Sequence, residues 1–370
     1  MRRKFLRRKP QRLRSLMRRK PPHGGIQPAG NECRKGDSTM TIKEVATLAG
    51  VSPAAVSRYM NGGSISEEKR ERIRAVIERT GYRPNPAAQT MRTGRCDEIG
   101  VIVPKIDSDS VSAIVAGISE GLKDKNYMVV LGSTAGVREE EIRYLSAMQS
   151  SNVAGIILMG TVMTPFLKDA ITASEKPVVV TGQNFEGVPS VFHDDFNAVK
   201  ELMNRMIARG RRKIVYIGVL EEDLAAGAAR HNGAVAAWKD AGFTQSLPCE
   251  IATFDTDGGV RCMEKLLKIH PGLDGVVCAT DRIALGAMQY LQSAGRKVPE
   301  DVSVAGVGDS WAGRLSAPPL TTAHLYFRQC GAAAVDMLLQ KINAAEDQVY
   351  TTSPIQQIML EYTIVERGSI

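Results

Sequence analysis

Residues 41–61 read TIKEVATLAGVSPAAVSRYMN, and this stretch decides the fold of the N-terminal part of the chain. Four aliphatic residues recur at the spacing of one helix face: Ile42, Val45, Ala46 and Ala49. Gly50 ends this helix, and Ser52 begins a second one, because serine is a good N-cap and Pro53 is tolerated at the first helical position. Two short helices joined by a tight turn are the plan of a helix-turn-helix, whose second helix reads a DNA major groove. An ordinary helical hairpin in a core has the same pattern, so this stretch alone leaves both interpretations open.

The residues that follow complete a three-helix module. Asn61-Gly62-Gly63 predicts a turn, and Ser66 is expected to cap a third helix over Glu67–Thr80. The aliphatic residues of this segment are expected to close a core over the first two helices: Ile65, Ile73, Val76 and Ile77. Beyond Gly81, the segment YRPNP predicts an extended linker, and residues 87–91 form a short piece that can become helical.

Charge is unevenly distributed along the chain. The whole chain carries +8, residues 1–39 carry +11, and the remainder therefore carries −3. Within that remainder, residues 40–98 carry +3 and residues 99–370 carry −6. A mildly basic small module precedes an acidic larger one, so a phosphate backbone is expected to be met at the N-terminal end.

Residues 1–39 are rich in Arg, Lys, Pro and Gly and have too few aliphatic residues to fold alone. One interpretation is a basic arm that embraces DNA. The favoured interpretation is that native translation begins at Met40, which opens directly into the first helix. The segment has no continuous apolar region of the kind found in secretory signals.

From residue 99 onward, short apolar runs alternate with amphipathic stretches. Strands are expected at residues 99–103, 128–131, 155–159, 177–180, 214–217, 275–278, 302–307 and 359–365. Helices are expected at residues 111–123, 139–148, 198–208, 228–241 and 283–293. This alternation predicts an α/β fold with two doubly wound parallel-sheet lobes, which would bind a ligand between them at the carboxyl ends of their strands.

Several functional classes find no support in the residues. The chain has no GxGxxG after a first strand, no GxxxxGK[ST], no GxSxG and no cluster at metal-ligand spacing, so we expect neither an enzyme nor a metal site. No apolar run is long enough to span a membrane. Six cysteines without any CxxC spacing favour free thiols in a reducing cytoplasm.

Five motifs together resemble the LacI family of bacterial transcriptional regulators. They are EVATLAGVSPAAVSRYMN, GYRPNPAAQTM, ATDRIALGAMQYL, VPEDVSVAGVGD and PPLTT, and the resemblance covers residues 41–370. It implies a helix-turn-helix domain at 40–83, a hinge helix and linker at 84–98, and a two-lobed sugar-binding and dimerisation domain at 99–370. The function so implied is a repressor of a carbohydrate operon, and the alternative is a sugar-binding transport protein.

The resemblance also implies which residues meet DNA. Pro53 and Ala54 occupy the positions that face base edges and can offer apolar contact to a thymine methyl group. Arg58 matches the arginine that contacts bases or phosphates. The other expected DNA-contacting residues of the headpiece are Thr41, Ser52, Ala55, Ser57 and Asn61.

The hinge segment is expected to enter the minor groove. Asn85, Ala88 and Met91 match the family's hinge pattern, with Met91 in place of the usual leucine wedge that kinks the duplex. Paired hinge helices require a homodimer, and two-fold symmetry implies a palindromic operator.

On the ligand side, Lys105 and Asp107 follow the first strand, and Gln183 follows another. Arg230 matches the family's sugar-gripping arginine, and Phe327 is expected to line the cleft. Asp281 is expected either to bind ligand or to cap the helix that follows it. Asp309 stands one position beyond an acid that grips sugar hydroxyls in relatives.

Three segments of the predicted ligand side indicate the chemical class of the effector. The segment KIDSDS lacks the aromatic residue that stacks on sugars in many relatives, which favours a ligand held by charge and hydrogen bonds. The segments KIDSDS, SVFHDD and AAGAARH look most like those of trehalose operon repressors. The expected effector is therefore a disaccharide or sugar phosphate, with trehalose 6-phosphate as one member of that class, and no cofactor is expected.

Overall fold

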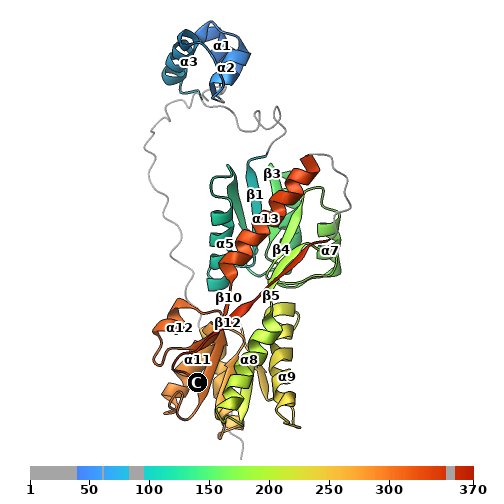
Figure 1. Ribbon diagram of the computed structural model, residues 1–370, viewed down its shortest axis with the longest axis vertical. Helices are drawn as coiled ribbons and strands as arrows, with labels where there is room; N and C mark the ends of the chain where they lie inside the picture. Colours follow the sequence, from blue (N-terminus) through green and yellow to red (C-terminus); the bar gives the residue numbers. More distant parts are fainter. Residues whose placement is uncertain (1–39, 61, 83–95, 347–354) are drawn as a thin grey trace, which may run out of the picture. The chain divides into compact units, whose positions relative to one another are not determined.

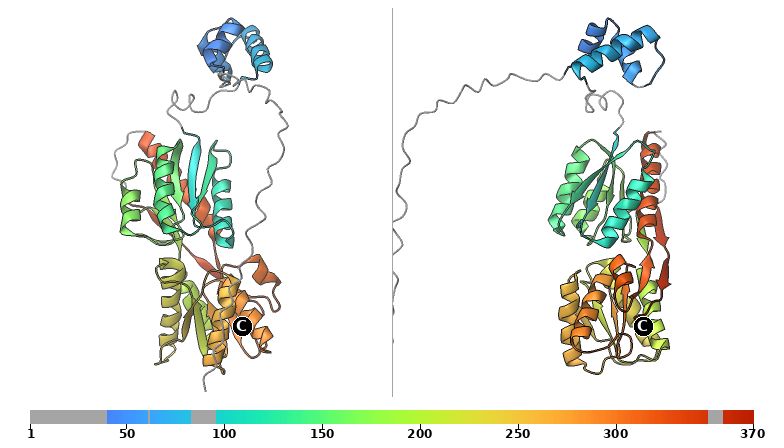
Figure 2. Two further views of the ribbon diagram at one scale, coloured as in Figure 1. Left: turned by 180° about the vertical axis from the view of Figure 1, so that it is seen from behind. Right: turned by 90° about the vertical axis from the view of Figure 1, so that its left-hand side faces the viewer.

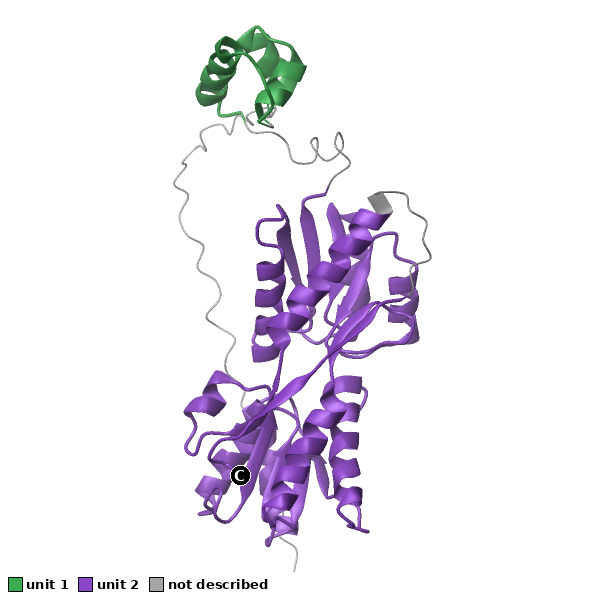
Figure 3. Ribbon diagram, viewed as in Figure 1, with its two compact units in different colours: residues 1–85 green, residues 86–370 purple. Residues whose placement is uncertain are grey.

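The computed structural model describes residues 40–60, 62–82, 96–346 and 355–370. The chain divides into two compact units, residues 1–85 and 86–370 (Figure 3). The predicted hinge at 84–98 lies largely outside the described residues, as does the whole segment 1–39. Within the described residues, no helix is both long enough and apolar enough to cross a membrane.

The smaller unit is a three-helix headpiece with the predicted bounds. It consists of α1 (Ile42–Ala49), α2 (Pro53–Met60) and α3 (Glu67–Thr80) (Figure 1). Val45, Val56 and Ile73 are fully buried at its centre. Gly50 ends α1 with φ +63°, a left-handed conformation that glycine adopts without a steric penalty. Ser66 occupies the N-cap position of α3, but the prediction that its side chain caps the helix is wrong, because it makes no such hydrogen bond.

The first lobe of the larger unit is built on a six-stranded sheet with the order β11-β5-β4-β3-β1-β2. The strands are β1 (Glu98–Val103), β2 (Met128–Ser133), β3 (Val153–Leu158), β4 (Val178–Thr181), β5 (Ser190–His193) and β11 (Gln357–Leu360). The helices are α5 (Asp109–Gly121), α6 (Arg138–Ser150), α7 (Pro165–Thr172) and α13 (Phe327–Glu346). Neighbouring strands pair in parallel, so their carboxyl ends meet at one edge of the sheet.

The second lobe has the strand order β12-β10-β9-β8-β6-β7, and its neighbouring strands pair in parallel except β12, which is antiparallel to β10. The strands are β6 (Ile214–Gly218), β7 (Cys249–Ile251), β8 (Gly275–Cys278), β9 (Ser303–Val307), β10 (Thr321–Leu325) and β12 (Tyr362–Val365). The helices are α8 (Asp195–Ala208), α9 (Arg230–Asp240), α10 (Thr256–Ile269), α11 (Asp281–Ser293) and α12 (Trp311–Leu315). A π-helix, η1 (Leu224–Ala229), leads into α9. The prediction of two doubly wound lobes is confirmed.

The chain passes between the lobes in three places within the described residues: after β5, after β10 and between β11 and β12 (Figure 2). The last crossover corrects a prediction. Residues 359–365 were expected to form one strand, but the chain leaves the strand conformation at Glu361 and contributes one strand to each sheet. One apolar segment can join two sheets in this way, because the backbone of β11 hydrogen-bonds to β5 and the backbone of β12 hydrogen-bonds to β10.

Candidate functional site

The headpiece presents one exposed surface on α2 and the turn before it. Ser52, Pro53, Ala54 and Arg58 are exposed, and Ser57 is half-buried. The prediction that Ala55 contacts DNA is wrong, because only 3% of this residue is exposed and it packs into the headpiece, where it cannot reach a base edge. Asn61, Asn85, Ala88 and Met91 lie outside the described residues, so their DNA-contacting roles remain predictions.

Two headpiece hydroxyl groups already make hydrogen bonds within the protein. The backbone N–H of Ala55 donates to Ser52 Oγ at 3.3 Å, which leaves the Ser52 hydroxyl hydrogen free to donate to a phosphate. Thr41 forms a capping box with Glu44, and both its hydroxyl and its backbone N–H donate to the Glu44 carboxylate, at 2.9 Å and 2.6 Å. These bonds hold the pKa of Glu44 below its ordinary value. Thr41 would have to give up a capping bond to contact phosphate.

A cavity of about 740 Å³ lies in the larger unit between its two lobes. Its walls include the carboxyl ends of strands from both sheets, which is where parallel sheets bind ligands. Its volume is within the range of small-molecule sites, about 300–1,000 Å³. Five of the seven predicted ligand-binding residues line it: Lys105, Gln183, Arg230, Asp281 and Phe327.

Arg230 is the central charged group of the second-lobe wall. Its Nε donates to Asp195 Oδ1 at 2.7 Å and its Nη1 donates to the carbonyl of Ala279 at 2.5 Å. Both members of the ion pair are nearly fully buried. The π-helix η1 ends immediately before Arg230, and π-helical turns are frequent at functional sites. Arg230 is thus held rigidly at the cavity while part of its guanidinium remains available to a ligand.

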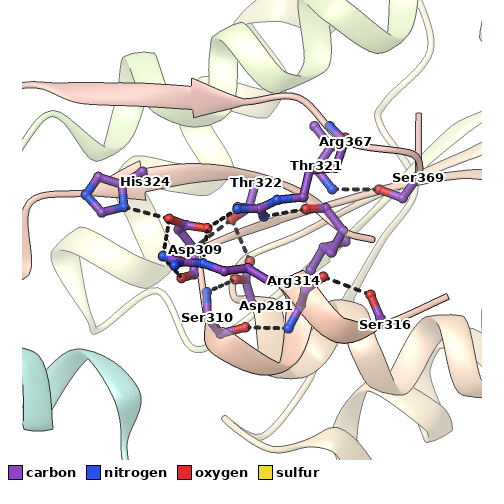
Figure 4. Close-up of polar contacts among 12 residues, drawn as sticks. Asp281, Asp309, Ser310, Arg314, Ser316, Thr321, Thr322, His324, Arg367 and Ser369 are labelled. Atoms are coloured by element: carbon purple, nitrogen blue, oxygen red, sulfur yellow. Dashed lines mark hydrogen bonds and ion pairs between the residues drawn. The ribbon is translucent and has the colours of Figure 1, made fainter. Parts of the chain in front are cut away.

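Asp281 lines the same wall, but it does not cap α11. Thr280 occupies the N-cap position and accepts from the N–H of Ile283 at 3.3 Å. The Asp281 carboxylate instead accepts from the hydroxyl of Thr322 and from the N–H of Ser310, each at 2.6 Å (Figure 4). Burial raises the pKa of Asp281, and these two hydrogen bonds oppose the shift.

Two predicted ligand-binding residues do not line the cavity. The prediction that Asp309 binds the ligand is wrong, because it does not line the cavity. Its carboxylate forms ion pairs with Arg314, Arg367 and His324 (Figure 4). Burial raises the pKa of Asp309, but the hydrogen bonds from Arg367 and Arg314 outweigh it and leave this pKa below its ordinary value. The prediction that Asp107 binds the ligand is also wrong, because this residue is exposed outside the cavity lining. Its backbone carbonyl accepts a hydrogen bond from Arg282 of the other lobe.

The first-lobe wall contributes cations of a different kind. Lys105 follows β1, and Arg138 begins α6 just beyond β2. The backbone N–H of Gly136 donates to the carbonyl of Pro104 at 2.7 Å, so the two loops lie together. Lys105 Nζ lies 5.6 Å from the ring centroid of Phe254, which belongs to the second lobe. Phe254 and Phe327 supply the aromatic surfaces that the segment KIDSDS lacks.

Gln183 joins the two lobes directly. Its amide nitrogen donates to the carbonyl of Thr161 and to Asp223 Oδ1, the latter at 2.9 Å. Asp223 belongs to the second lobe and also accepts from the backbone N–H groups of Ala225 and Ala226. Burial raises the pKa of Asp223, against the effect of these hydrogen bonds.

Several cavity residues were not predicted from the sequence. The main ones are Arg138, His193, Asp195, Asp223, Phe254 and Arg282. His193 and Asp195 stand in SVFHDD at the end of a strand, and that position is the signal that could have found them. Arg138 offers no comparable signal, because its segment VREEEIR reads as a solvated helix start.

Two family models cover most of the chain. Residues 41–85 match the model described as bacterial regulatory proteins, lacI family. Residues 96–361 match the model described as periplasmic binding proteins and sugar binding domain of LacI family. The chain belongs to the LacI family. The resemblance stated from the five motifs is therefore confirmed.

Individual relatives agree with this membership. The sucrose operon repressor of Staphylococcus xylosus is 29% identical over 301 residues, covering 81% of this chain and 93% of that protein. The transcriptional regulator TreR of Salmonella typhimurium is 29% identical over 311 residues, covering 83% and 95%. A solved transcriptional regulator CelR–cellobiose complex is 28% identical, covers 90% of this chain and all of its own, and superimposes with a TM-score of 0.67.

The LacI-family chain is therefore a DNA-binding transcriptional regulator with a sugar-binding effector domain. The prediction of a regulator is confirmed. The alternative of a transport protein is wrong, because the regulatory headpiece and the sugar-binding domain are matched in one chain. The named relatives are transcriptional regulators.

Proposed function

We propose that this regulator is a homodimeric cytoplasmic repressor of a carbohydrate-utilisation operon, and that a sugar or sugar phosphate in the interlobe cavity controls its affinity for a palindromic operator. The observation that carries the proposal is the cavity of about 740 Å³, in which a buried ion pair and two aromatic rings converge from both lobes. Sugars are bound through many hydroxyl hydrogen bonds on polar groups, with apolar ring faces against aromatic side chains.

The first-lobe cations favour an effector with an anionic group. Lys105 and Arg138 both line the cavity, and neither forms an ion pair with any described residue. Arginine and lysine beside one another suit a phosphate, because charge-assisted hydrogen bonds to phosphate oxygens are strong. A sugar phosphate would place its phosphate there and its hydroxyl groups against Arg230 and Asp281. Trehalose 6-phosphate is one member of this class, and the likeness to TreR supports testing it first.

On the DNA side, Arg58 is the strongest candidate reader of base edges. It is exposed on α2, and its guanidinium makes no ion pair with any described residue. Arginine can bond a guanine through two parallel hydrogen bonds, whereas Pro53 and Ala54 can offer apolar contact only. Ser52 and Ser57 would fix the register of the headpiece through phosphate contacts, which carry no sequence information.

The hinge residues would couple the two units. Asn85, Ala88 and Met91 would form paired minor-groove helices in the dimer, with Met91 as the wedge. A switch from almost fully bound to almost fully released operator needs a differential affinity of about 5.5 kcal/mol between the two states. A sugar that binds one lobe arrangement better than the other supplies this difference.

Two measurements test the proposal. A thermal-shift screen of the chain beginning at Met40, with trehalose, trehalose 6-phosphate, cellobiose and glucose 6-phosphate, should show stabilisation by at least one sugar. Selection from random duplexes should yield a palindrome whose binding that sugar changes. If no palindrome is preferred over random DNA with or without these sugars, the proposed function is wrong.

The base-reading role has its own test. Arg58→Ala should abolish preference for the selected operator while leaving salt-dependent binding to random DNA. The matched control is Arg70→Ala on α3, which removes the same charge from an arginine paired with Glu67. Equal loss of preference in both variants would show that charge alone, and not base contact by Arg58, is responsible.

A further inference from the structure

Two residues that line the cavity each carry a fully buried acceptor atom without a hydrogen-bond partner within the described residues. The atoms are Gln183 Oε1 and His193 Nε2. Only 3% of Gln183 and 5% of His193 are exposed, and both residues line the cavity. A buried acceptor without a donor costs free energy, and native proteins leave few such atoms unpaired. Because both residues line one ligand cavity, a ligand is the natural source of the missing donors.

The surrounding contacts fix both atoms as acceptors. The Gln183 amide faces the carbonyl of Thr161, which can only accept, so its nitrogen must lie there and its oxygen at the unpaired position. His193 hydrogen-bonds the backbone of Tyr326 through its other ring nitrogen. Burial lowers the pKa of His193, so the ring is neutral and Nε2 carries a lone pair.

The sheet brings these two residues to neighbouring strand ends. Strands β4 and β5 pair in parallel with Thr181 opposite Val191, and the N–H of Gly182 donates to the carbonyl of Val191 at 2.9 Å. His193 is the last residue of β5, and Gln183 follows the last residue of β4 by two positions, so both residues lie at the carboxyl ends of adjacent strands. Gln183 bonds Asp223 of the second lobe, and His193 precedes the first crossover, so both lie at the boundary between the lobes.

We propose that Gln183 Oε1 and His193 Nε2 receive hydrogen bonds from two hydroxyl groups of the effector, which makes His193 a specificity-determining residue. This inference rests on the proposed sugar-binding function. An ionised carboxylate or a phosphate dianion carries no hydrogen to donate, so the pair favours a neutral diol portion of the ligand. An anionic group must therefore bind elsewhere, and Lys105 and Arg138 are the cations available for it. Parting of the lobes at the Gln183–Asp223 bridge uncovers the pair to an entering ligand.

Two substitutions of His193 separate binding from structure. His193→Asn keeps a donor for the Tyr326 carbonyl but has no atom at the Nε2 position. His193→Gln places an amide oxygen near the Nε2 position but loses the bond to Tyr326. If the inference is correct, His193→Asn weakens sugar binding by about fivefold to tenfold, the loss of one hydrogen bond, and His193→Gln largely restores it.

The measurement is calorimetric titration of the full chain with trehalose, trehalose 6-phosphate and cellobiose. His231→Asn is the matched control, because His231 pairs with Glu221 and does not line the cavity. A sugar that binds wild type and all three variants equally overturns the inference and leaves the proposed function intact. Stronger binding by His193→Asn than by His193→Gln also overturns it, because affinity would then follow the Tyr326 bond. Failure of all three sugars to bind wild type overturns the proposed function, and the inference with it.

A second arm identifies the hydroxyl group. Single-deoxy derivatives of the sugar that binds are titrated against wild type and His193→Asn. One derivative should lose affinity for wild type and bind His193→Asn as well as the parent sugar does, because the hydroxyl and its acceptor form one pair. If every derivative loses the same affinity for both proteins, no hydroxyl pairs with His193 and the inference is wrong.

Discussion

The two lobes line one cavity, but they differ in how their charged side chains are held. In the second lobe three charged groups of the wall are buried and held by partners, Arg230 with Asp195, and Asp281 with Thr322 and Ser310. In the first lobe Lys105 and Arg138 reach the cavity without an ion-pair partner among the described residues. The buried second-lobe groups are thus preorganised, whereas the positions of the two first-lobe cations depend on what they bind.

The largest expected effect concerns the buried ion pair. Arg230→Ala should lower the free energy of unfolding by about 3–5 kcal/mol, because it leaves the Asp195 carboxylate buried without its counter-charge. It should also remove the response of operator binding to sugar. Denaturant unfolding and operator titration with and without sugar measure the two effects.

The control for Arg230 is Arg205→Ala in the same lobe. Arg205 pairs with Glu201 and Glu366 at the surface, so its loss should cost less than about 1 kcal/mol. The double variant Asp195→Leu/Arg230→Met removes both charges and should recover stability without recovering the sugar response. A sugar response retained in that variant would contradict the role of Arg230.

A second prediction separates the roles of Asp309 and Asp281. Asp309→Ala should lower the free energy of unfolding by about 1–3 kcal/mol, because Arg367 and His324 lose their partner, and should leave sugar affinity unchanged. Asp281→Asn should weaken sugar binding. The two variants are compared by denaturant unfolding and by calorimetric titration with sugar. Weaker sugar binding by Asp309→Ala would show that Asp309 belongs to the ligand site after all.

A third prediction concerns the class of ligand. The double variant Lys105→Ala/Arg138→Ala should weaken binding of a sugar phosphate by about tenfold to a hundredfold, since hydrogen bonds to charged groups contribute about 1.5–3 kcal/mol. It should leave binding of the corresponding neutral sugar unchanged. Calorimetry with trehalose and trehalose 6-phosphate tests both, and an equal loss for the two sugars would mean that these cations do not meet the phosphate.

The smallest expected effect is on pH dependence. Glu141 of α6 is buried, and burial raises its pKa while hydrogen bonds from Thr161 oppose the rise. The folded state therefore holds this proton more tightly than the unfolded state does, and stability falls as pH rises from the unfolded pKa to the folded pKa. Glu141→Gln should remove this fall, which unfolding at a series of pH values measures. The half-buried neighbour Glu140, paired with Arg143, is the control position, and Glu140→Gln should leave the fall in place.

The comparison between the walls also explains what sequence reasoning found and missed. Arg230 and Asp281 were found because each stands in a motif of the family. Asp309 was wrongly assigned to the ligand site because it lies next to such a motif. Only the fold shows that Arg367, 58 residues away, binds its carboxylate. Arg138 was missed because a lone arginine at a solvated helix start acquires meaning only from what surrounds it, whereas His193 stands at a strand end, which is a usable signal. Ala55 was assigned to DNA although the small headpiece uses it for packing.

The sequence by itself determined the headpiece and the alternation of strands and helices. Those features rest on local rules, such as the spacing of Val45 and Ala49 on one face and the left-handed Gly50, which act within a few residues. The tertiary structure alone decided which side chains share a cavity, and that Met359 and Ile364 belong to different sheets. Burial, pairing and unpaired acceptors arise between residues far apart in the chain, so periodicity along the sequence carries no record of them.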